Sequence, residues 1–449
     1  MRIFIFVLIS KLVTFVCKLF RKNGSVYPGF IVYDVFRQKK ILEHVKYPKY
    51  VIAVTGSSGK GSTTQIINHI LTQNGYDVCY NKNGSNGVLA ATTLILNNCT
   101  LSGKFKHDVL LLECDERHLK LIFGKNKMTH LIITNVTRDQ PARNGHPDIV
   151  FADIVKAIGK DTKLLLNADD PLVNTLSINT KNPVCTFGVG KTDDSYLKSN
   201  INSIDYAYCP ICNKKLNYEF YHYGHIGNYS CPGKDFSRGN VDYEATDIDF
   251  NKNNIKINGD DIYLNKGVLY AVYYTVAAYA LVSELGIDKS SILDSLNINK
   301  PESKRGKVLN IDNRNITMLE TKNENNLSYY QSIRFIKNQI GKKTIILGFD
   351  NVSRRYRFND LSWLWDVDFE LLDDKNIDKI FVIGRFRYDV LNRLEFTNIP
   401  KDKIVLVDEI DSLIKLVKES SIGDIYTMVC FDMTAKIKSL IEEDENENN

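Results

Sequence analysis

The sequence predicts an α/β protein with a parallel-sheet central domain, a small inserted segment and a C-terminal α/β domain. Three observations support this fold class. Short apolar runs of strand length alternate with helical patterns from residue 51 to about residue 190. A stretch of different composition, with paired cysteines, follows at about 203–240. A second series of apolar runs begins after Pro301 and again alternates with helical patterns.

The bulk composition is that of an ordinary globular protein. The chain has 449 residues, enough for two or three domains, and is 43% apolar and 25% charged. Its formal charge of +5 is small for this length and dispersed, which does not indicate a nucleic-acid partner. The nine cysteines are an odd number and mostly stand singly, which favours a reducing cytoplasm over a disulfide framework.

Residues 1–48 are expected to form a helical lead-in. The apolar run at residues 3–9 is too short to span a bilayer, and Lys11 and Lys18 interrupt the apolar pattern after it. No small-residue cleavage site of a signal peptide stands out. The apolar residues continue at helical spacing, so we expect an amphipathic helix with a basic face. Either it packs on the next domain, or it contacts the inner face of a membrane.

A glycine-rich loop follows the first strand of the central domain. The strand is expected at Val51–Val54, and a helical pattern begins directly after the loop. Glycines let backbone amides approach phosphate oxygens, and a helix N-terminus favours negative charge. Lys60 is expected to meet the terminal phosphates of a nucleotide, and the Ser62 hydroxyl to bind magnesium. A turn of this kind without a ligand is the alternative. The expected nucleotide-binding residues are Gly56, Ser57, Ser58, Gly59, Lys60, Gly61, Ser62 and Thr63.

Two further strand ends carry polar side chains. The loop after the strand at Val78–Tyr80 contains Asn83, Ser85 and Asn86, and loops at the carboxyl edge of a parallel sheet are where ligands bind. We expect these three residues to form a substrate loop. Glu113 ends the apolar run 109–112 and is the expected second magnesium ligand. The alternative is that the acids there only cap the next helix.

Several of these motifs resemble those of the Mur ligase superfamily. The loop T-G-x-x-G-K-x-S is similar to the superfamily's ATP site, and a run at 134–140 ends in Gln140 where many members have a magnesium-binding histidine. The run at 359–370, with both tryptophans, resembles that of the MurT-type branch. The resemblance implies an ATP-binding central domain over 49–300, a C-terminal domain over 301–440 and an acidic tail over 441–449, which composition predicts to be disordered.

The cysteine-bearing stretch resembles the zinc ribbon inserted in MurT-type proteins. Cys209, Cys212 and Cys231 match three of the four expected thiolates, but Lys234 stands where the fourth belongs. Structural zinc prefers four ligands, and such a site makes a segment with little core of its own fold. The shell is complete if another group, such as one of His222, His225 or Asp235, supplies the fourth ligand. A relic ribbon without zinc is the alternative.

The resemblance also implies a partner. In MurT-type proteins an aspartate near the paired tryptophans reaches a separate glutaminase of the class I amidotransferase type and supports its cysteine–histidine pair. That role falls on Asp360, with Asp366 as the runner-up; an acid that orients a histidine fixes its tautomer. No cysteine of this chain lies in a nucleophile elbow, which agrees with an external source of ammonia.

The activity implied by the resemblance is ATP- and Mg²⁺-dependent amidation, with Lys60 as a catalytic residue. The substrate would be the D-glutamate α-carboxyl of membrane-bound lipid II, converted to D-isoglutamine through an acyl phosphate in peptidoglycan synthesis. Ala271 and Tyr274 occupy positions where Mur ligases carry adenine-binding asparagines. Two alternatives stay open: a ligase that joins an amino acid to another carboxylate, and a non-catalytic subunit that binds ATP poorly, which Ala271, Tyr274 and Lys234 suggest.

Overall fold

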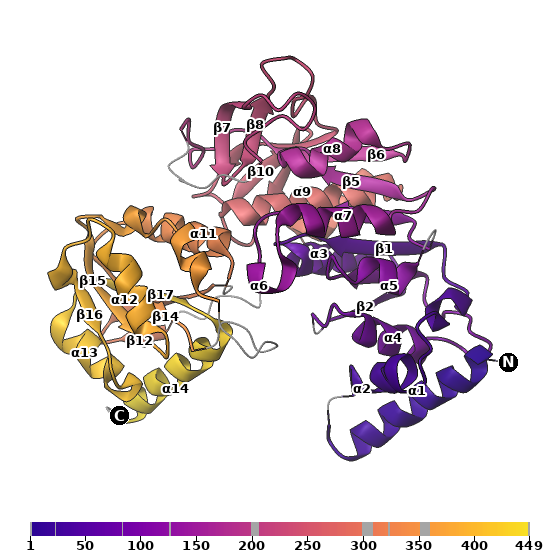
Figure 1. Ribbon diagram of the computed structural model, residues 1–449, viewed down its shortest axis with the longest axis horizontal. Helices are drawn as coiled ribbons and strands as arrows, with labels where there is room; N and C mark the ends of the chain where they lie inside the picture. The colour runs from indigo at the N-terminus through magenta and orange to yellow at the C-terminus, as the bar shows by residue number, and fades with distance from the viewer. Residues whose placement is uncertain are drawn as a thin grey trace. The chain divides into compact units, whose positions relative to one another are not determined.

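The structure is a computed structural model that describes residues 2–22, 24–82, 84–124, 127–198, 206–298, 309–321, 324–350 and 360–447. These residues divide into two compact units (Figure 1). Unit 1 contains the described residues up to 137, then 146–198 and 206–298. Unit 2 contains residues 138–145 and the described residues from 309 onward. The domain boundaries at 48, 300 and 440 stay predictions.

Unit 1 is built on a nine-stranded sheet with the order β11-β10-β9-β6-β5-β4-β1-β3-β2. Every neighbouring pair from β2 to β9 is parallel, and β9, β10 and β11 pair antiparallel. The central strands are buried on both faces, which explains their continuous apolar runs. The strands are β1 (Tyr50–Thr55), β2 (Val78–Tyr80), β3 (Val109–Glu113), β4 (His130–Ile133), β5 (Lys163–Asn167), β6 (Val184–Val189), β9 (Tyr243–Asp249), β10 (Asn254–Ile257) and β11 (Asp260–Tyr263).

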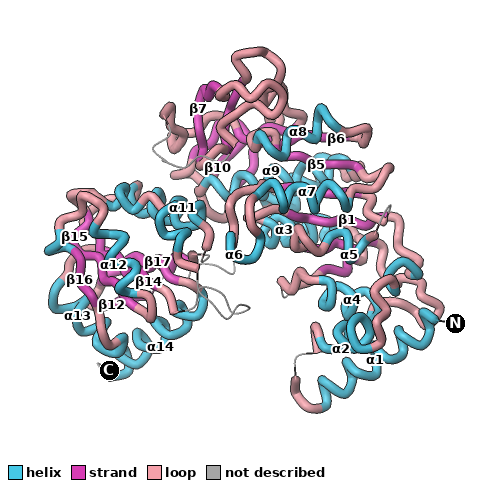
Figure 2. The backbone as a smooth tube through the Cα atoms, in the orientation of Figure 1, coloured by secondary structure: helices cyan, strands magenta, loops and turns pink. Residues whose placement is uncertain are grey.

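Helices cover this sheet, as the alternating pattern predicts (Figure 2). The expected helix at 268–285 is observed as α9 (Leu269–Glu284), which packs against α3 (Lys60–Gln73). Asp170 caps α8 by accepting hydrogen bonds from the amides of Leu172 and Val173. The other helices are α4 (Val88–Asn97), α5 (Leu119–Phe123), α7 (Pro147–Ala157), α8 (Pro171–Asn179) and α10 (Lys289–Asn297).

The N-terminal residues are helical and pack on α4. Val7 and Ser10 of the first helix, α1 (Arg2–Leu19), are fully buried, and the Ser10 hydroxyl donates to the Asn97 side chain at 2.9 Å. Short helices follow, namely α2 (Tyr27–Phe30), η1 (Ile31–Val35) and η2 (Ile41–His44). The helix is therefore fixed to unit 1 along one face.

A two-stranded hairpin lies outside the main sheet. It consists of β7 (Asn217–Tyr223) and β8 (Ile226–Ser230), with Gly224 at φ +53° in the turn. The buried apolar cluster beside it is small: Cys209, Leu216, Tyr229, Cys231 and Phe236. A cluster of this size has little apolar area with which to hold a fold by itself.

Unit 2 is a second α/β layer, with the strand order β12-β13-β17-β14-β15-β16. All pairs except β12–β13 are parallel. A central parallel-sheet domain followed by a C-terminal α/β domain is thus confirmed. The elements are β12 (Leu309–Ile311), β13 (Arg314–Glu320), α11 (Asn326–Lys337), β14 (Lys343–Gly348), η3 (Ser362–Asp366), η4 (Phe369–Leu372), β15 (Ile377–Ile383), α12 (Arg387–Glu395), η5 (Lys401–Lys403), β16 (Ile404–Leu406), η6 (Ile410–Ser412), α13 (Leu413–Ser420), β17 (Asp424–Val429) and α14 (Phe431–Glu447).

The expectation of a disordered tail from residue 441 is wrong for residues 441–447. These residues continue α14, which runs to Glu447. The reason is a tertiary contact that composition does not reveal, because both oxygens of the Asp444 carboxylate lie 2.7 Å from the Lys418 ammonium. A side chain of α13 thus holds the last helix against unit 2.

Residues 138–145 pack with unit 2 although they interrupt unit 1 in sequence. Arg138 pairs with Asp366 at 2.9 Å, and Asp139 accepts a hydrogen bond from the Asn325 side-chain amide at 2.9 Å. The Gln140 amide donates to the Glu324 carbonyl at 2.8 Å, just before the short helix α6 (Pro141–Asn144). Arg138 and Asp139, which directly precede Gln140 in the run at 134–140, therefore anchor this segment.

Candidate active site and metal centre

The loop between β1 and α3 requires glycine at two positions for different reasons. Gly56 has φ +128°, and a Cβ there would lie 2.2 Å from the Thr134 hydroxyl oxygen. Gly59 has φ +82°, but a Cβ there would meet nothing within 4 Å. Gly56 therefore allows close packing against the end of β4, whereas Gly59 provides a left-handed turn into α3.

Lys60, the first residue of α3, is only 8% exposed. Its ammonium donates to a carboxylate oxygen of Glu116 at 2.8 Å and also to the Gly56 carbonyl. Glu116 is 5% exposed, and the same oxygen accepts the Gly56 amide at 3.2 Å. Glu116 is not among the residues that the sequence predicts for the site. Its only signal was its place in the acidic cluster that follows β3.

Glu113 lies beside the first turn of α3. It ends β3 opposite Val54 of β1, and a Cβ on Gly61 would lie 3.1 Å from one of its carboxylate oxygens. Ser62 is on the same turn of α3 and is half-buried. Carboxylate and hydroxyl oxygens are ligands that Mg²⁺ accepts. The chemistry of this set fits magnesium, and the roles of Ser62 and Glu113 as its ligands stay predictions.

The other hydroxyl groups of the loop hold its shape. The Ser57 hydroxyl donates to the Thr137 carbonyl at 3.0 Å and accepts its amide at 2.9 Å. The Ser58 amide and hydroxyl both donate to the Asn135 side chain, at 3.1 and 3.2 Å. The Thr63 hydroxyl donates back to the Gly59 carbonyl at 2.9 Å. The segment after β4 thus supports the loop directly.

The expected substrate loop is fixed to β3 at its start. The Asn81 side chain donates to the Glu113 carbonyl and accepts the Glu113 amide, both at 2.9 Å. The Asp115 amide donates to the Asn86 carbonyl at 3.1 Å, and the Ser85 and Asn86 side chains are half-buried. Asn83 lies outside the described residues. The loop is therefore held at the carboxyl edge of the sheet, next to Glu113, and its role in substrate binding stays a prediction.

Two of the expected departures from the superfamily pattern can be located. Gln140 adopts a left-handed conformation at φ +48°, and its side-chain oxygen accepts a hydrogen bond from Arg143 at 3.0 Å. At the start of α9, Ala271 is buried, whereas Tyr274 is half-buried with its ring 6.1 Å from that of Tyr270.

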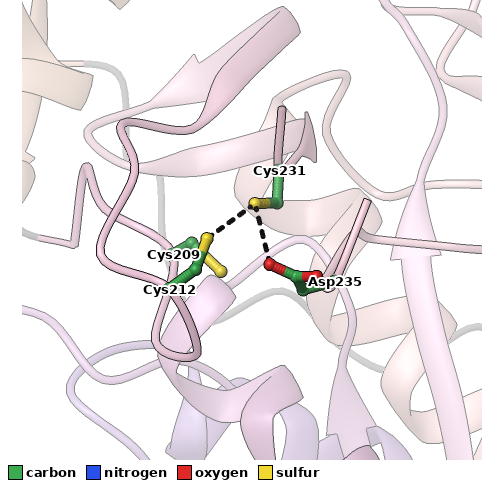
Figure 3. Close-up of side chains that lie close together, drawn as sticks. All are labelled: Cys209, Cys212, Cys231 and Asp235. Atoms are coloured by element: carbon green, nitrogen blue, oxygen red, sulfur yellow. Dashed lines mark hydrogen bonds between the residues drawn. The ribbon is translucent and has the colours of Figure 1, made fainter. Parts of the chain in front are cut away.

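Three cysteines and one aspartate gather at the base of the hairpin. The ligand atoms of Cys209, Cys212, Cys231 and Asp235 all lie within 4.8 Å of one another (Figure 3). The Cys212 and Cys231 sulfurs are 3.3 Å apart, and an Asp235 oxygen lies 3.9 Å from the Cys231 sulfur. Four ligands at this separation fit a tetrahedral metal, since zinc–sulfur bonds are about 2.3 Å long.

Backbone amides support the thiolate form of two of these cysteines. The Ile211 amide donates to the Cys209 sulfur at 3.4 Å, and the Gly233 amide donates to the Cys231 sulfur at 3.2 Å. Burial alone would raise the pKa of Cys231, but hydrogen bonds from Cys212 and the Gly233 amide lower it overall. The set therefore has the hydrogen bonding of a metal-binding turn.

The two histidines considered as fourth ligands lie outside the cluster. His222 contacts the Ser195 hydroxyl at 3.1 Å and the Val189 carbonyl at 3.0 Å. His225 is buried, with its Nε2 3.4 Å from an Asp170 oxygen. Of the three candidates, Asp235 is the one in place, because Lys234 adopts φ +61° and the turn brings the next side chain toward the sulfurs.

The two expected partner-facing aspartates have different surroundings. Asp366 pairs with Arg138, while a half-buried Asp360 accepts the Ser362 amide at 2.9 Å. The tryptophans also differ. Trp363 is 1% exposed and packs between Tyr329 and Phe349, but Trp365 is 52% exposed. The two tryptophans therefore have separate roles, one in the core and one on the surface.

Two family models match this chain, one mostly within unit 1 and the other within unit 2. The Mur ligase middle domain matches residues 54–229, and the MurT ligase C-terminal model matches residues 323–433. The chain is 26% identical over 388 residues to the lipid II isoglutaminyl synthase (glutamine-hydrolyzing) subunit MurT of Staphylococcus aureus (strain COL). This alignment covers 86% of this chain and 85% of that relative. The corresponding Streptococcus pneumoniae R6 subunit is 27% identical over 425 residues, 93% of this chain and 92% of that relative.

This chain is similar to the MurT branch of the Mur ligases along most of its length. The resemblance seen in its motifs is confirmed, and these matches indicate an ATP-dependent ligase. Solved Mur ligase structures share the fold. A pseudomurein peptide ligase type C from Methanothermus fervidus has a TM-score of 0.66 at 20% identity, covering 90% of this chain and 80% of that one. MurF from Thermotoga maritima, solved in complex with ADP, has a TM-score of 0.59 at 16% identity, covering 92% and 85%.

Proposed function

We propose that this chain is the ligase subunit that amidates the D-glutamate α-carboxyl of lipid II to D-isoglutamine, with ammonia from a separate glutaminase. The observation that carries the proposal is the pairing, in one chain, of a Mur ligase middle domain with a MurT C-terminal domain. Relatives that align with this chain over 85% and 92% of their own length are named as subunits of that glutamine-hydrolyzing synthase.

The reaction has two steps. First, an oxygen of the substrate carboxylate forms a bond to the terminal phosphorus of ATP while the bond to ADP breaks. Ammonia then attacks the carbonyl carbon of the acyl phosphate, inorganic phosphate leaves with the bonding electrons, and the nitrogen loses a proton. Little covalent chemistry falls to the protein, which positions the groups and stabilises the charge on the phosphoryl group.

The residues around the glycine loop suit the first step. The Lys60 ammonium is buried and held at the start of α3, where it would stabilise charge on the phosphate oxygens. Ser62 and Glu113 would hold Mg²⁺, which supplies charge neutralisation between the phosphates. The substrate loop carrying Ser85 and Asn86 lies at the same sheet edge, where an acceptor carboxylate would have to arrive.

We further propose that the set Cys209, Cys212, Cys231 and Asp235 holds a structural zinc ion. The support is the compact geometry of four ligand atoms of suitable chemistry, together with a small apolar cluster around them. A structural role fits better than a catalytic one, because four protein ligands leave no open position.

The glutaminase is proposed to dock near Asp360. Trp365 and Phe396 form an edge-to-face pair with centroids 5.0 Å apart, and both are more than half exposed. Exposed aromatic residues of this kind often dominate the binding energy of interfaces. Trp365→Ala should weaken binding of the glutaminase at least tenfold without lowering the melting temperature, whereas Trp363→Ala should unfold unit 2. Asp360→Ala should lower glutaminase turnover in the complex while leaving the affinity of the two subunits nearly unchanged.

The activity is tested by purifying the chain with its glutaminase and adding lipid II, ATP and glutamine. Mass spectrometry should show conversion of an acid to an amide. Lys60→Ala should abolish the conversion, while Lys156→Ala, on the exposed surface of α7, should not. No conversion with intact ATP binding would favour a different carboxylate substrate. No ATP binding at all would favour a non-catalytic subunit.

The proposed substrate is held in a membrane, so the chain would act at the cytoplasmic face. None of the helices in the described part of the chain combines the length and apolarity that crossing a bilayer requires.

A further inference from the structure

The outward face of α1 is apolar and exposed. Of the 29 large apolar side chains that the described residues expose, 13 lie within the first 36 residues. Seven of them recur at helical spacing along α1 and are between 42% and 68% exposed. This outer stripe consists of Phe4, Ile5, Leu8, Leu12, Phe15, Val16 and Leu19.

The opposite face of α1 is already used. Val7 and Ser10 are buried, the Lys11 ammonium donates to the Cys99 carbonyl at 2.7 Å, and Asn97 donates to the Thr14 hydroxyl at 2.8 Å. Figure 1 shows α1 (indigo) on the outer side of α4. These contacts fix the orientation of α1 on unit 1. The outer stripe therefore stays exposed at the surface.

The positive charge of the chain is concentrated around this stripe. Residues 1–40 contain eight basic residues and one acid, a formal charge of +7, whereas the whole chain carries +5. The expectation that the positive charge is dispersed along the chain is therefore wrong. Lys18, Arg21 and Lys22 are exposed at the C-terminal end of α1, and Arg37, Lys39 and Lys40 follow after η1.

We propose that the outer stripe and its basic rim dock this chain on the surface of a bilayer of anionic phospholipid. An apolar helix face bordered by cations is the chemistry of an in-plane membrane anchor. A second copy of this chain is a poorer occupant, because two surfaces of charge +7 repel each other. The proposal does not rest on the amidation activity, since the surface needs only the lipid.

The experiment is flotation of the full chain with vesicles that contain no substrate. The chain should float with vesicles of phosphatidylglycerol and bind vesicles of phosphatidylcholine at least tenfold more weakly. The variant Leu12→Gln/Phe15→Gln/Leu19→Gln should bind both at least a hundredfold more weakly. Its matched control is Leu121→Gln/Ile149→Gln/Ile178→Gln, which changes three side chains that are 46%, 54% and 49% exposed elsewhere on unit 1 and should float like the parent.

A second variant tests the charge without touching the apolar face. Lys18→Gln/Arg21→Gln/Lys22→Gln should lower the affinity for phosphatidylglycerol vesicles about fivefold for each charge removed. Its affinity for phosphatidylcholine vesicles should not change. Parent protein that stays unbound with phosphatidylglycerol would overturn the proposal, as would stripe and control variants that float equally. A lipid-free dimer that the stripe variant abolishes would assign the face to a second copy instead. Because no substrate is present, failure here leaves the proposed amidation untouched.

Discussion

The ammonium of Lys60 lies 2.8 Å from a carboxylate oxygen of Glu116, and both side chains are almost completely buried. The pair closes the glycine loop onto the residues that follow β3. A buried ion pair is costly to break, because the remaining partner keeps its charge without compensation.

Glu116→Gln should therefore destabilise unit 1 by about 3 kcal/mol, as thermal denaturation would show. Lys60→Met alone should cost a similar amount. The double variant should lose much less than the sum, because no isolated charge is left behind. Glu395→Gln, an exposed acid on α12, is the control and should change little. Strict additivity of the two single variants would contradict the pairing.

The two loop glycines should respond differently to alanine. A methyl group on residue 59 would meet no neighbouring atom, so Gly59→Ala should be destabilised only by the left-handed backbone conformation. The free energy of unfolding should fall by about 1–2 kcal/mol. Gly56→Ala places a methyl group 2.2 Å from the Thr134 hydroxyl and should prevent the loop from closing. Melting temperatures and ATP affinity by calorimetry separate the two. Equal effects would show that close contact with β4 does not constrain Gly56.

Metal analysis of the purified chain should give about one zinc per chain. Asp235→Ala should lower that occupancy and the melting temperature, whereas Asp235→Cys should restore four thiolates and retain the metal. Asp261→Ala, an exposed aspartate of β11, is the control. Asp235→Ala protein that keeps full zinc with unchanged stability would remove Asp235 from the ligand set.

The buried Asp368 predicts a pH dependence of stability. Burial raises its pKa from 3.8 to about 6, with Glu370 adding to the shift and Arg393 opposing it. The ionised form is thus disfavoured in the folded state. The penalty is absent below about pH 4, grows as the pH rises toward 6 and is complete above that. Asp368→Asn should stabilise unit 2 by up to about 2 kcal/mol at pH 8 and by almost nothing at pH 4. A gain that is the same at both pH values would argue against ionisation as the cause.

Much of the fold could be predicted from the sequence because buried parallel strands have continuous apolar sequences. The glycine loop and the position of Lys60 could also be predicted from the sequence, since a strand, a glycine turn and a helix follow one another directly in the chain. Asp235 was only one of three candidates for the fourth ligand. Its place depends on the left-handed backbone of Lys234, which no spacing rule reveals.

Other features depend on contacts between residues far apart in the chain. Glu116 is one of three acids in residues 113–116, and only the folded structure shows which of them meets Lys60. Asn81 and Asn135 carry no sequence signal of their own, yet they hold the expected substrate loop and the glycine loop in shape. The helical tail is a similar case, because the contact of Asp444 with Lys418 outweighs the local composition.

One buried carboxylate, that of Asp169, helps to join the region of the hairpin with the cysteines to the main sheet. Asp169 accepts hydrogen bonds from Arg238, which follows the hairpin, from the Tyr273 hydroxyl of α9 at 2.6 Å and from the Val189 amide at 2.8 Å. Loss of order in the hairpin would therefore reach the ends of β5 and β6. Removal of the proposed zinc by a chelator should therefore speed up amide hydrogen exchange in β5 and β6. Exchange in the core of unit 1 would then report on a metal site that lies outside this core.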